Sequence, residues 1–176
     1  LIVGRLIPDN NADIIVKEFM KSNSKKKLVI VGDVPYKDDF ATNIKKKQEE
    51  DERLIFTGYV RDQQLLAELY HNCFAYFHGH QFGGTNPSML KALAYGCGIL
   101  ALDTVFTQEM LDNGKYGYYF TKEDGNLKQL IENLEKTPEK LNKLREQSRE
   151  RITLNYTWEK ITNQYIDLFN SMLNTQ

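Results

Sequence analysis

Residues 79–98, "GHQFGGTNPSMLKALAYGCG", follow a hydrophobic strand and lead directly into an apolar helical pattern. Asn86-Pro87 predicts the helix start, because asparagine is a good N-cap and proline at the first helical position gives up no hydrogen bond. The adjacent Gly83 and Gly84 allow the backbone to approach a ligand closely. A helix that begins just after a strand is a ready anion site, although a tight turn without a ligand fits these residues equally well.

The strand-then-helix pattern of this stretch repeats along the chain. Continuous apolar runs, typical of buried parallel strands, occur at 1–5, 27–32, 53–58, 73–79 and 98–103, with a weaker run at 116–120. Helical spacing predicts helices over 12–20 (opened by Asn10 or Asn11 and Asp13), near 65–70, from Thr137-Pro138 onward, and over 157–172. The alternation predicts an α/β fold: a Rossmann-like three-layer α/β/α arrangement with a parallel six-stranded sheet.

Length and charge narrow the class of protein. The 176 residues suit a single domain, 1–176, and the 23 basic and 24 acidic residues give a net charge of −1, which does not favour nucleic acid as a partner. Cys73 and Cys97 lack metal or redox spacing, so we expect buried free thiols and a cytoplasmic location. The chain opens in mid-strand at Leu1, which suggests a piece of a longer protein.

Ligands of parallel α/β sheets bind at the carboxyl ends of the strands, where three kinds of polar residue are found. Arg5, after Gly4, suits a pair of phosphates, or is simply a surface arginine at a strand end. His78 and His80 share a strand face but have no clear third ligand, so we expect no metal, and His80 is a polar lining for the cleft. Glu109 either holds sugar hydroxyls or favours a helix N-terminus electrostatically.

These segments together resemble the C-terminal, donor-binding half of retaining glycosyltransferases of the GT-B fold, family 4. The resemblance rests on "VGRLIPDNN" (3–11), "KLVIVGD" (27–33), "RLIFTGYV" (53–60), "GGTNPSMLKALAYG" (83–96) and "YTWEKITNQY" (156–165), in the family's order. Within the family, "HGH" followed by "GGTNPS" looks closest to bacterial rhamnosyltransferase-like members. The absence of a P-loop lysine motif and of GxGxxG after the first strand removes the main support for P-loop and dinucleotide-binding alternatives.

The resemblance implies a sugar transferase without a cofactor. The donor would be a nucleotide-diphosphate sugar of the UDP, GDP or dTDP type, and its sugar would pass with retention to a glycan or lipid-linked acceptor in bacterial surface polysaccharide synthesis. An N-terminal domain absent from this chain would hold the acceptor, so this fragment alone should be inactive. The full-length protein would be cytoplasmic, with peripheral association at the inner membrane face compatible with its role. A non-catalytic sugar-nucleotide-binding subunit and a sugar-nucleotide epimerase are the alternatives.

The resemblance also assigns site residues, with Arg5 and Glu109 as the catalytic pair. Arg5 would bind the diphosphate and stabilise the leaving group. The substrate-binding residues would be Gly4, Asn10 and Asn11 after the first strand; Gly58, Tyr59 and Val60 at the base; His80, Gly83, Gly84, Thr85, Asn86 and Lys91 after the fourth strand; and the backbone of Phe106, Thr107 and Gln108 beside Glu109.

The sequence departs from the family pattern at three places. A lysine usually follows the arginine, but Asn10-Asn11 occupy that region. The signature helix usually carries two glutamates eight positions apart, and here Gly83 and Lys91 take their places. The second glutamate holds ribose hydroxyls, and an ammonium cannot accept those bonds. Lys91 therefore either supplies a positive charge to the phosphates or leaves the ribose unheld and points to solvent.

Overall fold

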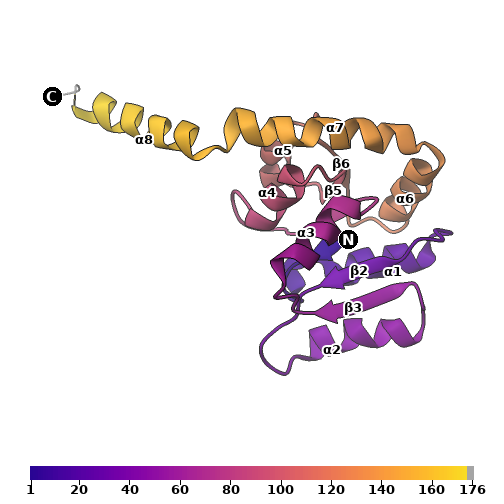
Figure 1. The fold of residues 1–176 in the computed structure, drawn as a ribbon. Coiled ribbons are helices and arrows are strands. Elements are labelled where there is room, and N and C mark those ends of the chain that lie inside the picture. Colours follow the sequence, from indigo (N-terminus) through magenta and orange to yellow (C-terminus); the bar gives the residue numbers. More distant parts are fainter. Residues whose placement is uncertain (174–176) are drawn as a thin grey trace.

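The computed structural model describes residues 1–173, and six short parallel strands form its centre (Figure 1). The strands are β1 (Ile2–Val3), β2 (Leu28–Val31), β3 (Leu54–Gly58), β4 (Tyr76–His78), β5 (Ile99–Leu102) and β6 (Gly117–Phe120). Every predicted strand is present, and each is shorter than its apolar run. The fourth strand begins only at Tyr76, because Cys73 is the C-cap of the preceding helix. All the strand pairs are parallel, as predicted.

The sheet differs from the predicted one in its continuity. The strands form two three-stranded sheets, in the orders β1-β2-β3 and β4-β5-β6, instead of one six-stranded sheet. The two sheets meet at β1 and β4, where the Leu1 nitrogen donates to Ala75 O at 2.9 Å and the Phe77 N–H donates to Leu1 O at 2.9 Å. These main-chain bonds involve Leu1, whereas β1 itself, only two residues long, contributes Val3 O as the acceptor of the Tyr76 hydroxyl at 3.4 Å.

Helices cover both faces of the strands. They are α1 (Ala12–Lys21), α2 (Asp39–Lys46), α3 (Gln63–Asn72), α4 (Pro87–Ala94), α5 (Val105–Met110), α6 (Asn126–Lys136), α7 (Pro138–Asn155) and α8 (Trp158–Leu173), with short 3₁₀ helices η1 (Pro8–Asn10) and η2 (Lys47–Glu49). One buried cluster joins the strands to α1, α2 and α6, and a second joins them to α3, α4 and α5. The predicted three-layer α/β/α arrangement is thus confirmed.

Two predicted helix starts are confirmed, and a third helix begins as predicted but without the expected side-chain cap. Pro87 and Pro138 begin α4 and α7 as expected. Asn11 precedes α1 but does not cap it with its side chain: the residue has a left-handed backbone, with φ of 48°, and makes no side-chain bond to the helix. Its amide group is engaged elsewhere, at the end of β4.

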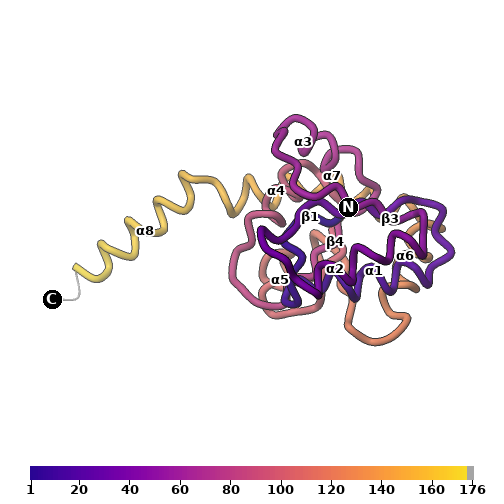
Figure 2. Tube along the Cα trace, turned by 90° about the horizontal axis from the view of Figure 1, so that it is seen from below, coloured from indigo at the N-terminus to yellow at the C-terminus, as the bar shows by residue number. Residues whose placement is uncertain are grey.

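Helix α8 extends away from the rest of the chain (Figures 1 and 2). It contains no buried residue, and Trp158 is 88% exposed. The apolar residues predicted along this helix therefore form an exposed face. No helix within residues 1–173 is long and apolar enough to cross a membrane. The last three residues of the predicted domain, 174–176, lie outside the described part of the chain.

Candidate functional site

The candidate site lies where the strand order changes direction. Chain connections run outward from β1 to β3 on one side and from β4 to β6 on the other, so the junction of β1 and β4 is the switch point at which parallel α/β folds bind ligands. Arg5 follows β1 at this edge, and His80 follows β4. The topology therefore brings together two residues predicted for the site that are distant in sequence.

Main-chain and amide hydrogen bonds fix the loop after β1 to the end of β4. Asn11 Nδ2 donates to Gly79 O at 2.7 Å, and the Gln81 N–H donates to Asp9 O at 2.9 Å. Gly79 is required here because a β-carbon on it would lie 2.3 Å from Asn10 O. The two loops consequently form one rigid floor for the site.

Asn10 and Asn11 serve this floor with their side-chain amides. Asn10 Nδ2 donates to Arg5 O at 2.8 Å, and both asparagines are buried. These bonds orient the main chain that carries Arg5. The amide donors that the sequence analysis offered to a substrate are thus already engaged within the protein.

Arg5 itself is exposed, and within residues 1–173 its guanidinium makes no hydrogen bond or ion pair. Leu6, which is fully buried, anchors the chain directly beside it. A planar guanidinium with five donors, held at a switch point without an acidic partner, can bind an oxyanion through two parallel bonds. This arrangement fits the predicted contact with phosphate.

His78 and His80 lie one above the other, with ring centroids 4.4 Å apart and an interplanar angle of 11°. Burial, and to a lesser extent His80, lowers the pKa of His78 to about 3, so His78 is neutral at physiological pH. Burial, followed by the nearby Arg5 charge, also lowers the pKa of His80. The Nδ1 atoms of both rings are buried and have no hydrogen-bond partner. No group of three potential metal-ligating side chains gathers anywhere in the described residues.

The glycine loop after β4 is open. Gly83 has a positive φ of 117°, and no atom lies within 4 Å of a β-carbon placed on Gly83 or Gly84. Thr85 is exposed at the same loop. Asn86 caps α4, its Oδ1 accepting the Ser88 N–H at 2.9 Å, as predicted. The backbone of this loop is accessible to a ligand.

Lys91 lies on the exposed face of α4. Its ammonium makes no hydrogen bond or ion pair with any residue of 1–173. The position is one turn beyond Ser88 and lies in the last turn of the eight-residue α4. A long, unpaired side chain there can turn toward the glycine loop or toward solvent.

The loop after β3 presents the residues predicted for the base. Gly58 has φ of +64°, and its carbonyl accepts the Gly32 N–H at 2.8 Å. Tyr59 is 56% exposed, and its hydroxyl donates to Asp33 O at 2.9 Å. Val60 packs against the second core cluster. An exposed aromatic ring beside a glycine is a suitable platform for a planar ligand.

The position of Glu109 in α5 excludes one of its two predicted roles. This residue lies in the last turn of α5, not the first, so its carboxylate does not stabilise the helix N-terminus, and that interpretation was wrong. Its side chain is exposed, whereas Thr107 is buried and donates to Leu102 O at 2.6 Å. Gln108 Nε2 donates to Asp103 at 2.7 Å, and Phe106 is 37% exposed. The carboxylate of Glu109 remains accessible to a sugar hydroxyl.

Lys122 is a further cation at this edge that the sequence analysis missed. It follows β6, and its Nζ donates to Gln81 Oε1 at 2.5 Å, which joins the loops after β4 and β6. A lysine just beyond the last apolar run was the available signal.

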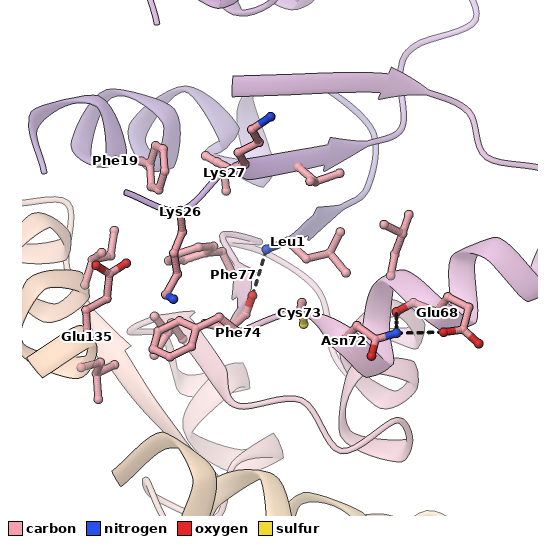
Figure 3. Close-up of a pocket in the computed structure, with 17 residues that line it drawn as sticks. Leu1, Phe19, Lys26, Lys27, Glu68, Asn72, Cys73, Phe74, Phe77 and Glu135 are labelled. Carbon is pink, nitrogen blue, oxygen red and sulfur yellow. Dashed lines mark hydrogen bonds between the residues drawn. The ribbon is translucent and has the colours of Figure 1, made fainter. Parts of the chain in front are cut away.

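A further cavity lies elsewhere. Its volume is about 440 Å³, and the seventeen residues that line it include Phe74, which precedes β4, and Phe77 within β4 (Figure 3). No predicted site residue lines it. Cys73 lies on its wall, and Cys97 is nearby, with 3.8 Å between the two sulfur atoms. Both thiols are free, as predicted, but only Cys97 is fully buried, and Cys73 is partly exposed. The cavity lies at the edge opposite to Arg5, and its mostly apolar lining also includes Lys26, Lys27, Glu68 and Glu135.

Sequence comparison identifies the family. The family described as "Glycosyl transferases group 1" matches residues 1–151 of this chain. The chain belongs to this family. A group 1 glycosyltransferase domain agrees with the resemblance to GT-B family 4 enzymes and with the Rossmann-like half of that fold.

Relatives of this group 1 glycosyltransferase have varied names. A probable sucrose-phosphate synthase of Thermosipho melanesiensis is 25% identical over 193 residues, covering 96% of this chain and 40% of the relative. The structure of HepE from Anabaena in complex with UDP aligns with a TM-score of 0.83 at 17% identity, covering 97% of this chain and 48% of that one. A sucrose-phosphate synthase of Thermosynechococcus elongatus aligns with a TM-score of 0.80 at 20% identity, covering 99% and 46%.

The group 1 glycosyltransferase chain therefore spans less than half the length of these relatives. Their names do not support the narrower likeness to rhamnosyltransferases.

Proposed function

We propose that this chain is the donor-binding half of a retaining glycosyltransferase that uses a nucleotide-diphosphate sugar and needs no metal. The observation that carries the proposal is the unpaired Arg5 guanidinium at the switch point between β1 and β4, held against the end of β4 by Asn10 and Asn11. Membership of the glycosyl transferases group 1 family supports this use of the site.

In this proposal Arg5 binds the diphosphate and stabilises the negative charge that develops as the glycosidic bond breaks. The main chain that carries this guanidinium is fixed before the reaction, because Asn10 holds the Arg5 carbonyl and the buried Leu6 holds the next residue. Preorganised donors of this kind lower the barrier most where charge appears in the transition state. The nucleoside diphosphate therefore departs more readily than it would without Arg5.

The remaining parts of the donor follow the edge of the strands. The base lies against the backbone of Gly58, Tyr59 and Val60, and the exposed ring of Tyr59 offers a flat surface. The sugar and phosphates face the open loop of Gly83 and Gly84. The accessible carboxylate of Glu109 accepts sugar hydroxyls from the other side.

The wider role is also a proposal, because the chain spans under half of its relatives. We propose that a further domain binds a glycan or lipid-linked acceptor, that the whole protein acts in the cytoplasm or at the inner membrane face, and that it contributes to bacterial surface polysaccharide. HepE, whose structures hold UDP and UDP-glucose, supports a uridine nucleotide as the first donor type to test. The narrower specificity for rhamnose rests on "HGH" and "GGTNPS" alone.

Calorimetric titration of this chain with UDP, GDP and dTDP tests the donor site. We expect one of them to bind, and Arg5→Ala to weaken that nucleoside diphosphate about 10- to 100-fold, since charge-assisted hydrogen bonds contribute about 1.5–3 kcal/mol. The corresponding nucleoside should bind equally to both proteins. Arg149→Ala, an exposed arginine on α7, is the matched control. Absence of binding by all three nucleotides at millimolar concentration, to this chain and to the full-length protein, contradicts the proposal.

A non-catalytic sugar-nucleotide-binding subunit is the second candidate. It is favoured by Gly83 and Lys91, which stand where the family resemblance expects glutamates. The full-length protein separates the two: turnover of a bound donor that requires an acceptor identifies a transferase. Binding without turnover identifies the subunit, and donor conversion without an acceptor identifies an epimerase.

A further inference from the structure

The proposed diphosphate site has fewer fixed cations than its ligand has charges. Arg5 is the one fixed cation on the floor formed by the loops after β1 and β4 in the described chain. The adjacent Asn10 and Asn11 are neutral, and their amides are engaged with the main chain. A diphosphate carries at least two negative charges, so a second positive group on this floor would be favoured.

His80 is placed to be that group. A β-carbon on Gly4 would lie 3.4 Å from His80 Cε1, so the imidazole packs against the backbone that leads into Arg5. The Gln81–Asp9 bond fixes the chain on one side of His80, and the Asn11–Gly79 bond fixes it on the other. The His78 ring, stacked at 4.4 Å, sets the plane of the imidazole. The position of His80 is thus as rigid as that of Arg5.

We propose that His80 is the second cationic group of the diphosphate site and that it takes up one proton from solvent when the donor binds. The inference rests on the proposed function. On binding, the donor enters the site and one H⁺ from solvent joins the neutral His80 ring. The resulting imidazolium then faces a phosphate oxygen. The proton returns to solvent when the nucleoside diphosphate leaves. His78 is a positioning residue in this scheme, because it holds the ring without contacting the donor.

The charges around His80 explain why the proton arrives only with the ligand. Burial disfavours an imidazolium here, and the Arg5 charge after β1 repels it further, so the pKa of His80 is lowered in the free protein. His78 from β4 is neutral, and Lys122 from the loop after β6 contacts the neighbouring Gln81. No carboxylate bonds to His80 within residues 1–173. A bound diphosphate supplies the missing negative charge and thereby raises the pKa of His80.

The test measures proton uptake with nucleotide sugars instead of free nucleoside diphosphates. The terminal phosphate of a free diphosphate titrates near neutral pH itself, whereas that of a nucleotide sugar is esterified and does not. UDP-glucose, GDP-mannose and dTDP-glucose are titrated calorimetrically at pH 7.5 in buffers of different ionisation enthalpy. The dependence of the observed heat on the buffer gives the number of protons taken up.

We expect the wild-type chain to take up a proton with the donor it binds, and its affinity to fall with rising pH by up to about tenfold per unit where a full proton is linked. His80→Asn should lose the uptake and the pH dependence, and bind about tenfold more weakly at pH 6.5. His71→Asn, an exposed histidine of α3, should behave as wild type. Equal thermal unfolding midpoints at pH 7.5 verify that each variant is folded.

Each of the following results would overturn the inference. Donor binding without proton uptake by the wild-type chain, or uptake that persists in His80→Asn, removes His80 from the role but leaves the proposed function intact. Uptake that is lost in His78→Asn and kept in His80→Asn would place the proton on His78 instead of His80. Failure of all three nucleotide sugars to bind overturns the proposed function together with the inference.

Discussion

The buried His78 should make this chain lose stability as the pH falls from 8 to 5. Its pKa is lowered from 6.5 to about 3 in the folded state, mainly by burial. Below pH 6.5 the unfolded chain therefore binds a proton that the folded chain does not, and the free energy of unfolding decreases. At pH 5 the difference amounts to about 2 kcal/mol, because stability falls by about 1.4 kcal/mol for each pH unit below 6.5.

Urea titrations of the wild-type chain and His78→Gln at pH 8, 7, 6 and 5 measure this effect. The variant changes packing at every pH, so the informative quantity is the change in unfolding free energy between pH 8 and 5. We expect this change to be smaller by about 2 kcal/mol in His78→Gln. His80 contributes in the same direction and should leave a residual dependence in the variant. His71→Gln should keep the full wild-type dependence, and an unaltered dependence in His78→Gln would refute the reasoning.

Two further substitution experiments examine the loop after β4. Gly79→Ala places a β-carbon 2.3 Å from Asn10 O and should destabilise the fold by about 1–3 kcal/mol, whereas Gly84→Ala meets no atom and should change the free energy of unfolding by less than about 0.5 kcal/mol. Urea titration compares them, and equal stabilities would contradict the account of Gly79. Gly84→Ala should nevertheless weaken UDP binding about tenfold in calorimetry if the backbone approaches the ligand, and unchanged affinity would argue against that approach. Lys91→Glu should weaken UDP about tenfold if the ammonium contacts phosphate. Tighter binding would indicate instead that the ribose contact expected from the family had been restored.

The strands and most helix starts could be predicted because local rules determine them. Continuous apolar runs marked the buried parallel strands, and Asn86-Pro87 and Thr137-Pro138 marked helix starts where a missing N–H has no cost. Parallel pairing followed from the alternation of strand and helix. The separation into two sheets did not, because the bonds that join the two sheets, from Leu1 to Ala75 and Phe77, link residues far apart in the sequence.

The site could be predicted less completely for the same reason. Topology placed Arg5 and His80 at the same edge, as the strand pattern indicated. The partners of Asn10 and Asn11 are main-chain carbonyls, one of them 68 residues away, and sequence alone does not reveal such contacts. From the sequence, Glu109 was related to a helix N-terminus, but the residue lies in the last turn of α5, because its place in the helix depends on where α5 begins.

Helix α8 shows the limit of periodicity as a guide to burial. Its apolar spacing predicted a helix over 157–172, and α8 spans Trp158–Leu173. The same spacing does not say what the apolar face packs against, and that face is exposed in residues 1–173.

The most direct test of the account is a crystal structure of this chain with the nucleoside diphosphate or nucleotide sugar that binds it in calorimetry. The account predicts that the diphosphate contacts the Arg5 guanidinium at the junction of β1 and β4 and faces the backbone of Gly83 and Gly84. A ligand bound in the apolar cavity at the opposite edge, or at the switch point with its phosphates turned away from Arg5, would contradict it.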